Sequence, residues 1–450
     1  INPMNMKGLT KKDIIRQINS IIRKSYKFLG PEQLSNYIEK IKEKHTTKSK
    51  KNIALKREFS NRLIVIDEVH NLRDTSEENQ KKNITKNLFE IAKNSENLKF
   101  LLLSATPMFN SPLEIIWLLN LMNTNDNRSI IVPKQVFNDN GTFIIDENGK
   151  EIGKELLIRK ATGYVSYVRG EDPYTFPYRI YPSMYMKENT LLSYNSPRFQ
   201  LNKTIIQQPI EKLDLCIVSI GSYQNVVYNF IIQKIIKEYK IESNIKIGFQ
   251  QLSAPIQALD IVYPYEKFDD IINTERLEDE EMNETISYKE FIGKRGLDRI
   301  VNYNKNDKTN YVYKTQITEK YGRIFSQNEI GKYSSKIKFI CNNVENSEGI
   351  ILIYSQYIDG GCVPIALCLE EMGYTRYGRN NLFKKPPTKS NGLKYSMITG
   401  NLSLSPNNMR EIKKAIKDDN INGNNIKIII ISEAASEGID LKNIRQVNIL

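Results

Sequence analysis

Two acidic residues and a histidine directly follow a short apolar run. The run covers residues 63–66, and Asp67, Glu68 and His70 come after it. Four consecutive apolar residues predict a strand buried on both faces, as in a parallel sheet covered by helices. Such sheets bind ligands at the carboxyl ends of their strands. An aspartate there can hold Mg²⁺ on nucleotide phosphates, and a neighbouring glutamate can polarise a water. The alternative is that Asp67 only caps the following helix.

Two later stretches repeat this plan of an apolar strand followed by a polar turn. They are residues 101–107, LLLSATP, and residues 428–441, IIIISEAASEGIDL. The polar or small residues of interest in the two turns are Ser104, Thr106, Ser432, Gly438 and Asp440. Only glycine lets a backbone approach phosphate or ribose without a Cβ clash, although Gly438 could equally belong to an ordinary turn.

Strand and helix patterns alternate from about residue 333 to the end. Strands are expected at 350–354, 397–399 and 426–431, with helices between them. This alternation predicts a parallel sheet. Ser355 and Gln356 follow the first of these strands and Gly400 follows the second, so the pattern places them at the same edge of the sheet.

Composition favours a polyanionic partner. Lys and Arg number 65 against 52 acidic residues, which gives a net charge of +13. Residues 40–57 are strongly basic, and they form either a solvated surface or a surface that contacts the phosphates of a nucleic acid. The four cysteines contain no C-x-x-C pair and only two histidines are present, so we expect no zinc site and a reducing compartment. No membrane span or signal peptide is visible.

The region between about 126 and 332 is less regular. A strand is expected at 215–218 and a helix at 223–236, and residues 266–284 have the composition of an acidic, solvated linker. Residues 164–181 interleave aromatic residues with arginine, which either stack on nucleotides or fix a loop to the domain. Residues 293–296, GKRG, form a short basic turn that could contact phosphate.

A phosphate-binding loop of the form G-x-x-x-x-G-K-[ST] does not occur in this sequence. Gly149-Lys150 is followed by Glu151 in a turn-rich stretch, so it does not complete one. The chain starts at Ile1 and stops at Leu450 inside a strand pattern. We therefore expect an internal fragment of a longer protein.

The three strand-end motifs, taken in order, resemble motifs II, III and V of superfamily 2 helicases and translocases, a DEAH-like box among them. Residues 104–120 and 335–356 resemble the chromatin-remodelling branch. Residues 163–181, 293–298 and 436–441 look more closely like helicase-type proteins of large nucleocytoplasmic DNA viruses, relatives of the poxvirus early transcription factor small subunit and nucleoside triphosphate phosphohydrolase I. The resemblance is specific at the motifs and loose in the middle.

This resemblance implies an α/β fold with two tandem RecA-like domains, both truncated here, that clamp ATP between them and step along DNA. Residues 1–125 would be the C-terminal part of the first domain, 126–332 an inserted or linking region of irregular α+β structure, and 333–450 the N-terminal part of the second. Motif I and the arginine finger of motif VI would lie outside the chain, so the fragment alone should hydrolyse ATP poorly. Residues 433–437 depart from the Gly-rich turn of the remodelling branch.

The resemblance also implies individual roles. Asp67 would hold Mg²⁺ and Glu68 would activate water. His70, Ser104 and Thr106 would couple the nucleotide site to the DNA track, and Gly438 and Asp440 would face ATP across the cleft. The residues expected near the nucleic-acid backbone are Ser355, Gln356, Gly400 and Ser432.

Three functions remain open from the sequence. The first is a DNA-dependent ATPase that translocates on duplex DNA during viral transcription, with RNA polymerase or transcription factors as partners. The second is a strand-separating RNA or DNA helicase, and the third is a non-enzymatic DNA-binding scaffold. The viral resemblance implies a location in the virion and the host cytoplasm.

Overall fold

The chain folds into two compact units, Ile1–Phe176 and Pro177–Leu450. The computed structural model describes residues 10–72, 79–108, 111–138, 141–167, 178, 180–192, 196–200, 204–210, 212–238, 249–273, 286–433 and 439–450. The predicted domain limits after residues 125 and 332 stay a prediction, because one compact unit can hold a domain together with an insertion packed on it. Within the described ranges, no helix combines the length and the apolar character needed to cross a bilayer.

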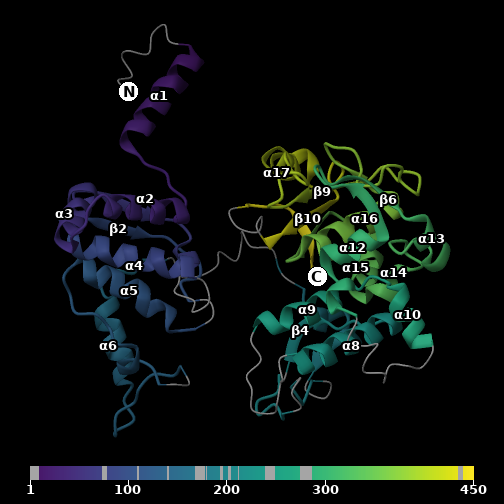
Figure 1. The fold of residues 1–450 in the computed structure, drawn as a ribbon, viewed down its shortest axis with the longest axis horizontal. Coiled ribbons are helices and arrows are strands. Elements are labelled where there is room, and N and C mark those ends of the chain that lie inside the picture. The colour runs from purple at the N-terminus through teal and green to yellow at the C-terminus, as the bar shows by residue number, and fades with distance from the viewer. Residues whose placement is uncertain are drawn as a thin grey trace. The chain divides into compact units, whose positions relative to one another are not determined.

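The first unit contains a small parallel sheet with helices packed against it (Figure 1). Its strands β1 (Leu63–Ile66) and β2 (Lys99–Leu102) are parallel, with Ile66 opposite Leu102. The helices are α1 (Lys11–Ser25), α2 (Pro31–Glu43), α3 (Lys48–Phe59), α4 (Asn79–Asn94), α5 (Glu114–Asn125) and α6 (Ile152–Ala161), with short 3₁₀ turns η2 (Val69–Leu72) and η3 (Pro133–Gln135). The Thr10 hydroxyl caps α1 by accepting from the Asp13 N–H.

The core of the first unit lies between helices α2 to α5 and one face of the strands. Its most deeply buried side chains include Ile38, Leu55, Leu88, Ile91 and Leu121. The prediction that β1 is buried on both faces is wrong. Leu63 is 60% and Val65 53% exposed, whereas Ile66 is buried. Successive side chains of a strand point to opposite faces, and the described helices cover only one of them.

The second unit is built on a five-stranded sheet in the order β11-β7-β10-β9-β8. All its strand pairs are parallel. The strands are β7 (Ile350–Ser355), β8 (Thr375–Arg376), β9 (Lys394–Ile398), β10 (Ile428–Ser432) and β11 (Ile444–Ile449). The helices of this part are α15 (Ser335–Glu345), α16 (Val363–Glu371) and α17 (Asn408–Ala415), with the turns η7 (Ile358–Cys362) and η8 (Asp418–Asn420).

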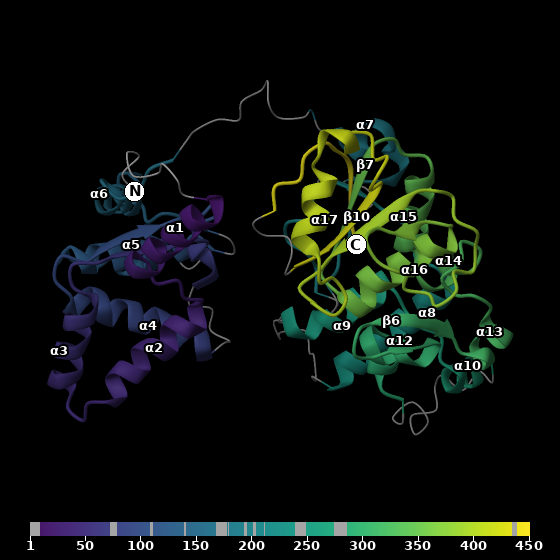
Figure 2. The ribbon, with the colours of Figure 1, turned by 90° about the horizontal axis from the view of Figure 1, so that it is seen from above.

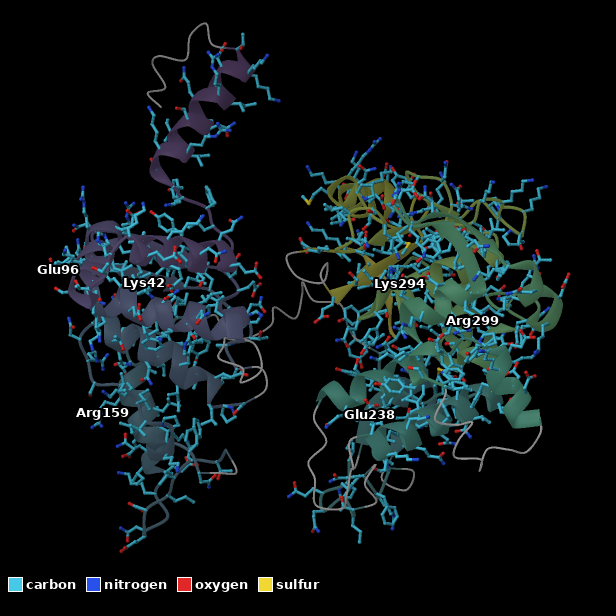
Figure 3. All side chains as sticks on the ribbon, viewed as in Figure 1. Lys42, Glu96, Arg159, Glu238, Lys294 and Arg299 are labelled. Atoms are coloured by element: carbon cyan, nitrogen blue, oxygen red, sulfur yellow. The ribbon has the colours of Figure 1, made fainter. Side chains whose placement is uncertain are left out.

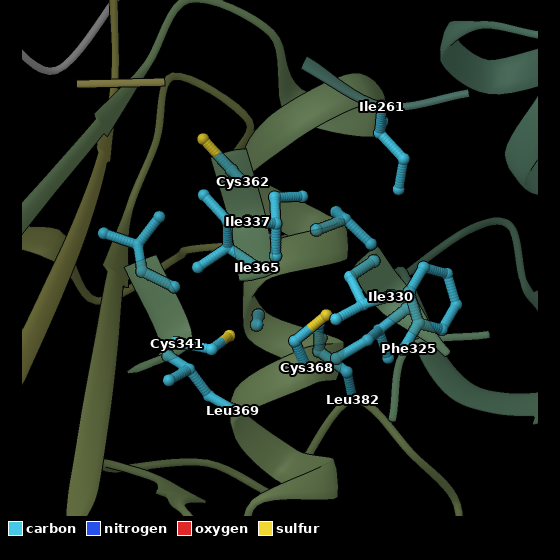
Figure 4. Packing of buried hydrophobic residues seen from close by; sticks show 14 of the residues in the cluster. Ile261, Phe325, Ile330, Ile337, Cys341, Cys362, Ile365, Cys368, Leu369 and Leu382 are labelled. Atoms are coloured by element: carbon cyan, nitrogen blue, oxygen red, sulfur yellow. The ribbon is translucent and has the colours of Figure 1, made fainter. Parts of the chain in front are cut away.

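Both faces of this sheet are covered. On one face Ile428 and Ile430 of β10 pack in the large core that α15 and α16 share, and on the other Ile429 and Ile431 pack near Ala415 of α17. Figure 2 shows α17 on one side of β10 and β7 and the helices α15 and α16 on the other. Figure 4 shows how side chains of α16 interlock with those of α15. The predicted α/β class, with parallel sheets flanked by helices, is confirmed.

Much of the region before residue 333 packs against this sheet unit. Its elements are α7 (Pro182–Tyr185), η4 (Lys187–Asn189), β3 (Thr190–Leu192), β4 (Lys212–Cys216), α8 (Ser222–Glu238), α9 (Phe249–Asp260), α10 (Glu266–Asn273), η6 (Tyr288–Glu290), α12 (Gly293–Ile300), β5 (Val301–Asn304), β6 (Thr309–Tyr313), α13 (Thr315–Tyr321) and α14 (Ile330–Tyr333).

The helix predicted at 223–236 is confirmed as α8, and the strand predicted at 215–218 begins earlier, as β4. The linker predicted from residue 266 is wrong at its start, because Phe268 of α10 is fully buried against Phe230 and Phe291.

All four cysteines are free thiols. Cys341, Cys362 and Cys368 are buried and Cys216 is partly exposed. Among the described residues, no group of three or more His, Cys, Asp or Glu side chains is arranged to hold a metal.

Candidate nucleotide site and nucleic-acid edge

The turns after β1 and β2 lie side by side in the first unit. The Leu103 N–H donates to the Ile66 carbonyl at 2.9 Å, and the Val69 N–H donates to the Leu103 carbonyl at 3.0 Å. Glu68 lies in the left-handed region with φ 49°, which costs a non-glycine residue about 1 kcal/mol or more. The chain therefore turns sharply at Glu68, directly after Asp67. The two hydrogen bonds between residues 66–69 and Leu103 hold the turn after β1 against the turn after β2.

The three residues predicted to couple the nucleotide to nucleic acid, His70, Ser104 and Thr106, are connected to one another and to Glu68. His70 Nδ1 lies 2.9 Å from Ser104 Oγ and 3.2 Å from Glu68 Oε2. The Thr106 N–H donates to Ser104 Oγ at 3.1 Å. The His70 side chain is only 12% exposed, whereas that of Glu68 is 39% exposed. A carboxylate open to solvent is thus linked through a largely buried imidazole to the turn after the second strand.

Asp67 is exposed at the same edge. Its Oδ1 accepts from the Glu68 N–H at 3.0 Å. The alternative role, capping the following helix, has no hydrogen bond to support it among the described groups, because this contact is to the adjacent residue rather than to η2. A carboxylate of this kind fits Mg²⁺, which binds proteins through one or two carboxylates and takes its other ligands from water and phosphate.

The carboxyl ends of β7, β9 and β10 meet at one edge of the second unit. Ser432 pairs with Ser355 in the strand register, and the Gly400 N–H donates to Ser432 Oγ at 3.3 Å. The structure therefore brings together Ser355, Gln356, Gly400 and Ser432, as the sequence predicted. Their contact with nucleic acid stays a prediction.

The four residues differ in access. Ser355 is 0% and Ser432 2% exposed, while Gly400 is exposed and Gln356 is half-buried. The Ser355 hydroxyl donates to the Tyr357 carbonyl at 3.2 Å and accepts from the Tyr357 N–H. In this conformation the two serines can shape the edge, and Gly400 and Gln356 are the residues that a ligand can reach.

Cys362 and Gly361 of η7 pack against the ends of strands β7 and β10 at this edge. The Cys362 thiol lies 3.8 Å from the Ser355 carbonyl and 3.7 Å from the Ile431 carbonyl, so it bridges β7 and β10. Burial raises the pKa of Cys362 to about 12, which keeps it a neutral thiol and not a nucleophile. A Cβ on Gly361 would lie 1.9 Å from Ser355 Oγ.

Two predicted nucleotide-facing residues are less well defined. Gly438 lies outside the described residues. Asp440 is exposed in the connection that crosses from β10 to the start of β11. Because each compact unit is placed only by itself, the predicted approach of Asp440 to a nucleotide held by the first unit stays a prediction.

The sequence reasoning missed two lysines that join the basic segment 40–57 in space. They are Lys86 and Lys93 of α4, which line a cavity together with residues of α2 and α3. Their spacing of seven residues, two helical turns, was a signal that could have placed them on one face of α4.

The turns D-E-V-H and S-A-T follow two parallel strands of the first unit, at the same edge of its sheet. The homologues of this chain are viral helicase-like proteins of superfamily 2. No family model matches the chain.

Three relatives illustrate this. A protein of Acanthamoeba polyphaga mimivirus named as an ATP-dependent RNA helicase is 22% identical over 87% of this chain and 54% of its own length. Nucleoside triphosphatase I of Heliothis armigera entomopoxvirus is 26% identical over 86% of this chain and 50% of its own length. A termination factor homologue of African swine fever virus is 22% identical over 86% of this chain and 50% of its own length.

The chain therefore spans about half the length of these curated relatives. Among solved structures, the ATPase core of Sulfolobus solfataricus SWI2/SNF2 aligns with 88% of this chain and 58% of that chain, at 14% identity and a TM-score of 0.25. A TM-score this low does not bear on the fold.

Proposed function

We propose that the protein to which this chain belongs is a nucleic-acid-dependent ATPase, and more specifically a DNA-dependent one that translocates on duplex DNA. The observation that carries the proposal is the connected chain Glu68, His70, Ser104 and Thr106 beside the exposed Asp67. Two of the relatives are named as an ATP-dependent helicase and a nucleoside triphosphatase, which supports the use of ATP.

Each residue has a physical task in this proposal. Asp67 would hold Mg²⁺, which would supply neutralisation of the phosphate charge when bound with the nucleotide. Glu68 orients and polarises the attacking water from its solvent-accessible position. His70 contacts both the Glu68 carboxylate and the Ser104 hydroxyl, and Ser104 accepts from the Thr106 N–H. A shift of Glu68 on nucleotide binding therefore moves the turn that follows β2. The edge formed around Gly400 and Gln356 contacts the nucleic-acid backbone, and the roles of Gly438 and Asp440 toward ATP stay expectations from the sequence resemblance.

A role in viral transcription, with RNA polymerase or transcription factors as partners, belongs to the same proposal. Its support is the African swine fever virus relative, which is named a termination factor homologue. The location we propose, virion and host cytoplasm, follows from such a role. A strand-separating helicase is the second candidate, because the mimivirus relative is named an RNA helicase.

The test is ATP hydrolysis by the protein extended to its natural reading frame, with duplex DNA, single-stranded DNA, RNA or no nucleic acid. Glu68→Gln should lower turnover by about a hundredfold or more, because it removes the group that polarises water. The matched control is Glu147→Gln, which makes the same change at an exposed position of the first unit and should leave turnover unchanged.

The outcomes separate the candidates. Stimulation by duplex DNA that Glu68→Gln removes supports the translocase. Stimulation by RNA alone, or release of a paired strand, favours the helicase. Salt-sensitive DNA binding without hydrolysis under any condition would replace both with the non-enzymatic scaffold. Unchanged turnover in Glu68→Gln contradicts the task given to Glu68.

A further inference from the structure

A lysine-lined cavity lies among α2, α3 and α4 of the first unit. Its volume is about 780 Å³. Five lysines line it, against a single carboxylate, that of Glu90. The lysines are Lys42, Lys48, Lys51, Lys86 and Lys93. They come from three helices that are separate in the sequence, so folding gathers the charge in one concave place.

The lysines fall into two groups. Lys42 is held in place, because its Nζ lies 2.7 Å from Glu90, 3.1 Å from Glu39 and 2.9 Å from the Asn87 amide oxygen. Burial by itself would lower the pKa of Lys42, but the hydrogen bonds to Glu90 and Glu39 raise it above its usual value, so this ammonium stays charged. Figure 3 labels Lys42 among the side chains of the first unit.

The other four lysines form no ion pair with any side chain that the structure describes. Lys48, Lys86 and Lys93 are exposed and Lys51 is half-buried. Their charge is therefore available to a ligand. The half-buried ring of Phe89 and the side chain of Leu55 supply an apolar part of the lining.

This cavity lies away from the candidate nucleotide site. The end of α4 leads into β2, and Glu96, just after α4, accepts from the Asn61 N–H just before β1. Lys93 is thus at the amino-terminal edge of the strands, whereas Asp67 and Glu68 follow their carboxyl ends. Four residues of strand separate these edges by about 13 Å.

We propose that this cavity binds the phosphodiester backbone of nucleic acid, as a contact additional to the strand-end edge of the second unit. Four lysines without ion pairs among the described residues, spread over α3 and α4, match a repeated negative charge better than a single anion does, and the Phe89 ring within the lining offers a surface for a base. The proposal goes beyond the ATPase proposal and does not depend on it.

Equilibrium binding without nucleotide tests it, using labelled single-stranded DNA, duplex DNA and RNA over a range of salt concentrations. The double variant Lys86→Gln/Lys93→Gln should weaken binding about tenfold. On single-stranded DNA it should also make the negative slope of log K against log salt shallower by about 1.4, because each of the two lost phosphate contacts contributes about 0.7. Lys86→Arg/Lys93→Arg keeps the charges and should bind as the unaltered protein does.

The matched control is Lys134→Gln/Lys187→Gln, which removes the same charge at exposed positions outside the cavity. Equal loss of affinity in this control would show that net charge alone matters and would overturn the proposal. So would unchanged binding in the cavity variant, or dependence on Lys86 and Lys93 for vesicles of acidic lipid but not for nucleic acid. Because no ATP is hydrolysed in this measurement, its failure is distinguishable from failure of the ATPase proposal.

Discussion

Strands β1 and β10 have nearly the same sequence pattern and opposite environments. Each has four consecutive aliphatic residues followed by a polar turn, LIVI before Asp67 and IIII before Ser432. In β10 all four aliphatic side chains are buried, whereas in β1 Leu63 and Val65 are more than half exposed. The difference arises because β10 lies at the centre of five strands with helices on both faces. An aliphatic run thus predicts a strand, and its neighbours decide how much of it is buried.

The largest expected effect is that of a cavity in the central strand. Ile430→Ala should lower the unfolding free energy of the second unit by about 2–5 kcal/mol, because it empties space at a fully buried position. Val65→Ala should cost less than about 1 kcal/mol, because that side chain is 53% exposed.

Denaturant unfolding followed by two probes separates these effects. Trp117, the only tryptophan, lies in the first unit, so its fluorescence reports that unit, while circular dichroism reports both. Ile430→Ala should move the dichroism transition and leave the fluorescence transition in place. Equal costs for the two variants would contradict the contrast between the strands.

The second prediction concerns a carboxyl group buried beneath the larger sheet. Glu370 accepts from the Leu382 and Phe383 N–H groups and from the Tyr395 hydroxyl, near Arg376. Burial raises the pKa of Glu370 from 4.5 to about 7, although these hydrogen bonds oppose it. The folded state then binds the proton more tightly than the unfolded chain, so stability from this group is complete below pH 4.5 and is lost as the pH rises to about 7.

The expected loss is up to about 3 kcal/mol across that range. Glu370→Gln should flatten the pH dependence of the second unit's unfolding free energy. Burial also raises the pKa values of Glu371 and Glu411, so a shallower slope of the same sign should remain. A slope identical to that of the unaltered protein would contradict the role of Glu370.

The third prediction tests the packing beneath the strand ends. Gly361→Ala should destabilise the second unit by about 1–3 kcal/mol, because the new methyl group would meet Ser355 Oγ. Gly331→Ala is the control, since its methyl group would meet nothing closer than 3.6 Å. Thermal unfolding by circular dichroism measures both, and a neutral Gly361→Ala would show that the Ser355 turn adjusts easily.

The candidate site was predictable where residues are close in sequence to a strand end. Asp67, Glu68 and His70 follow one strand and Ser104 and Thr106 follow another, and parallel pairing alone places both turns at one edge. The contacts of His70 with Ser104 and Glu68 needed the structure, because they depend on the left-handed turn at Glu68. The same holds for the burial of Ser355 and Ser432, which depends on the packing of η7 beneath their strands.

The sequence by itself determined the strands β1, β2, β7, β9 and β10, their order along the chain and the polar residues at their ends, because apolar runs and turn residues are local signals. The resemblance to viral helicase-like proteins rests on the same local signals. Only the tertiary structure decided that β1 has an exposed face, that α10 buries Phe268, and that lysines of three helices line one cavity. These features depend on contacts between residues distant in sequence, and no local pattern contains them.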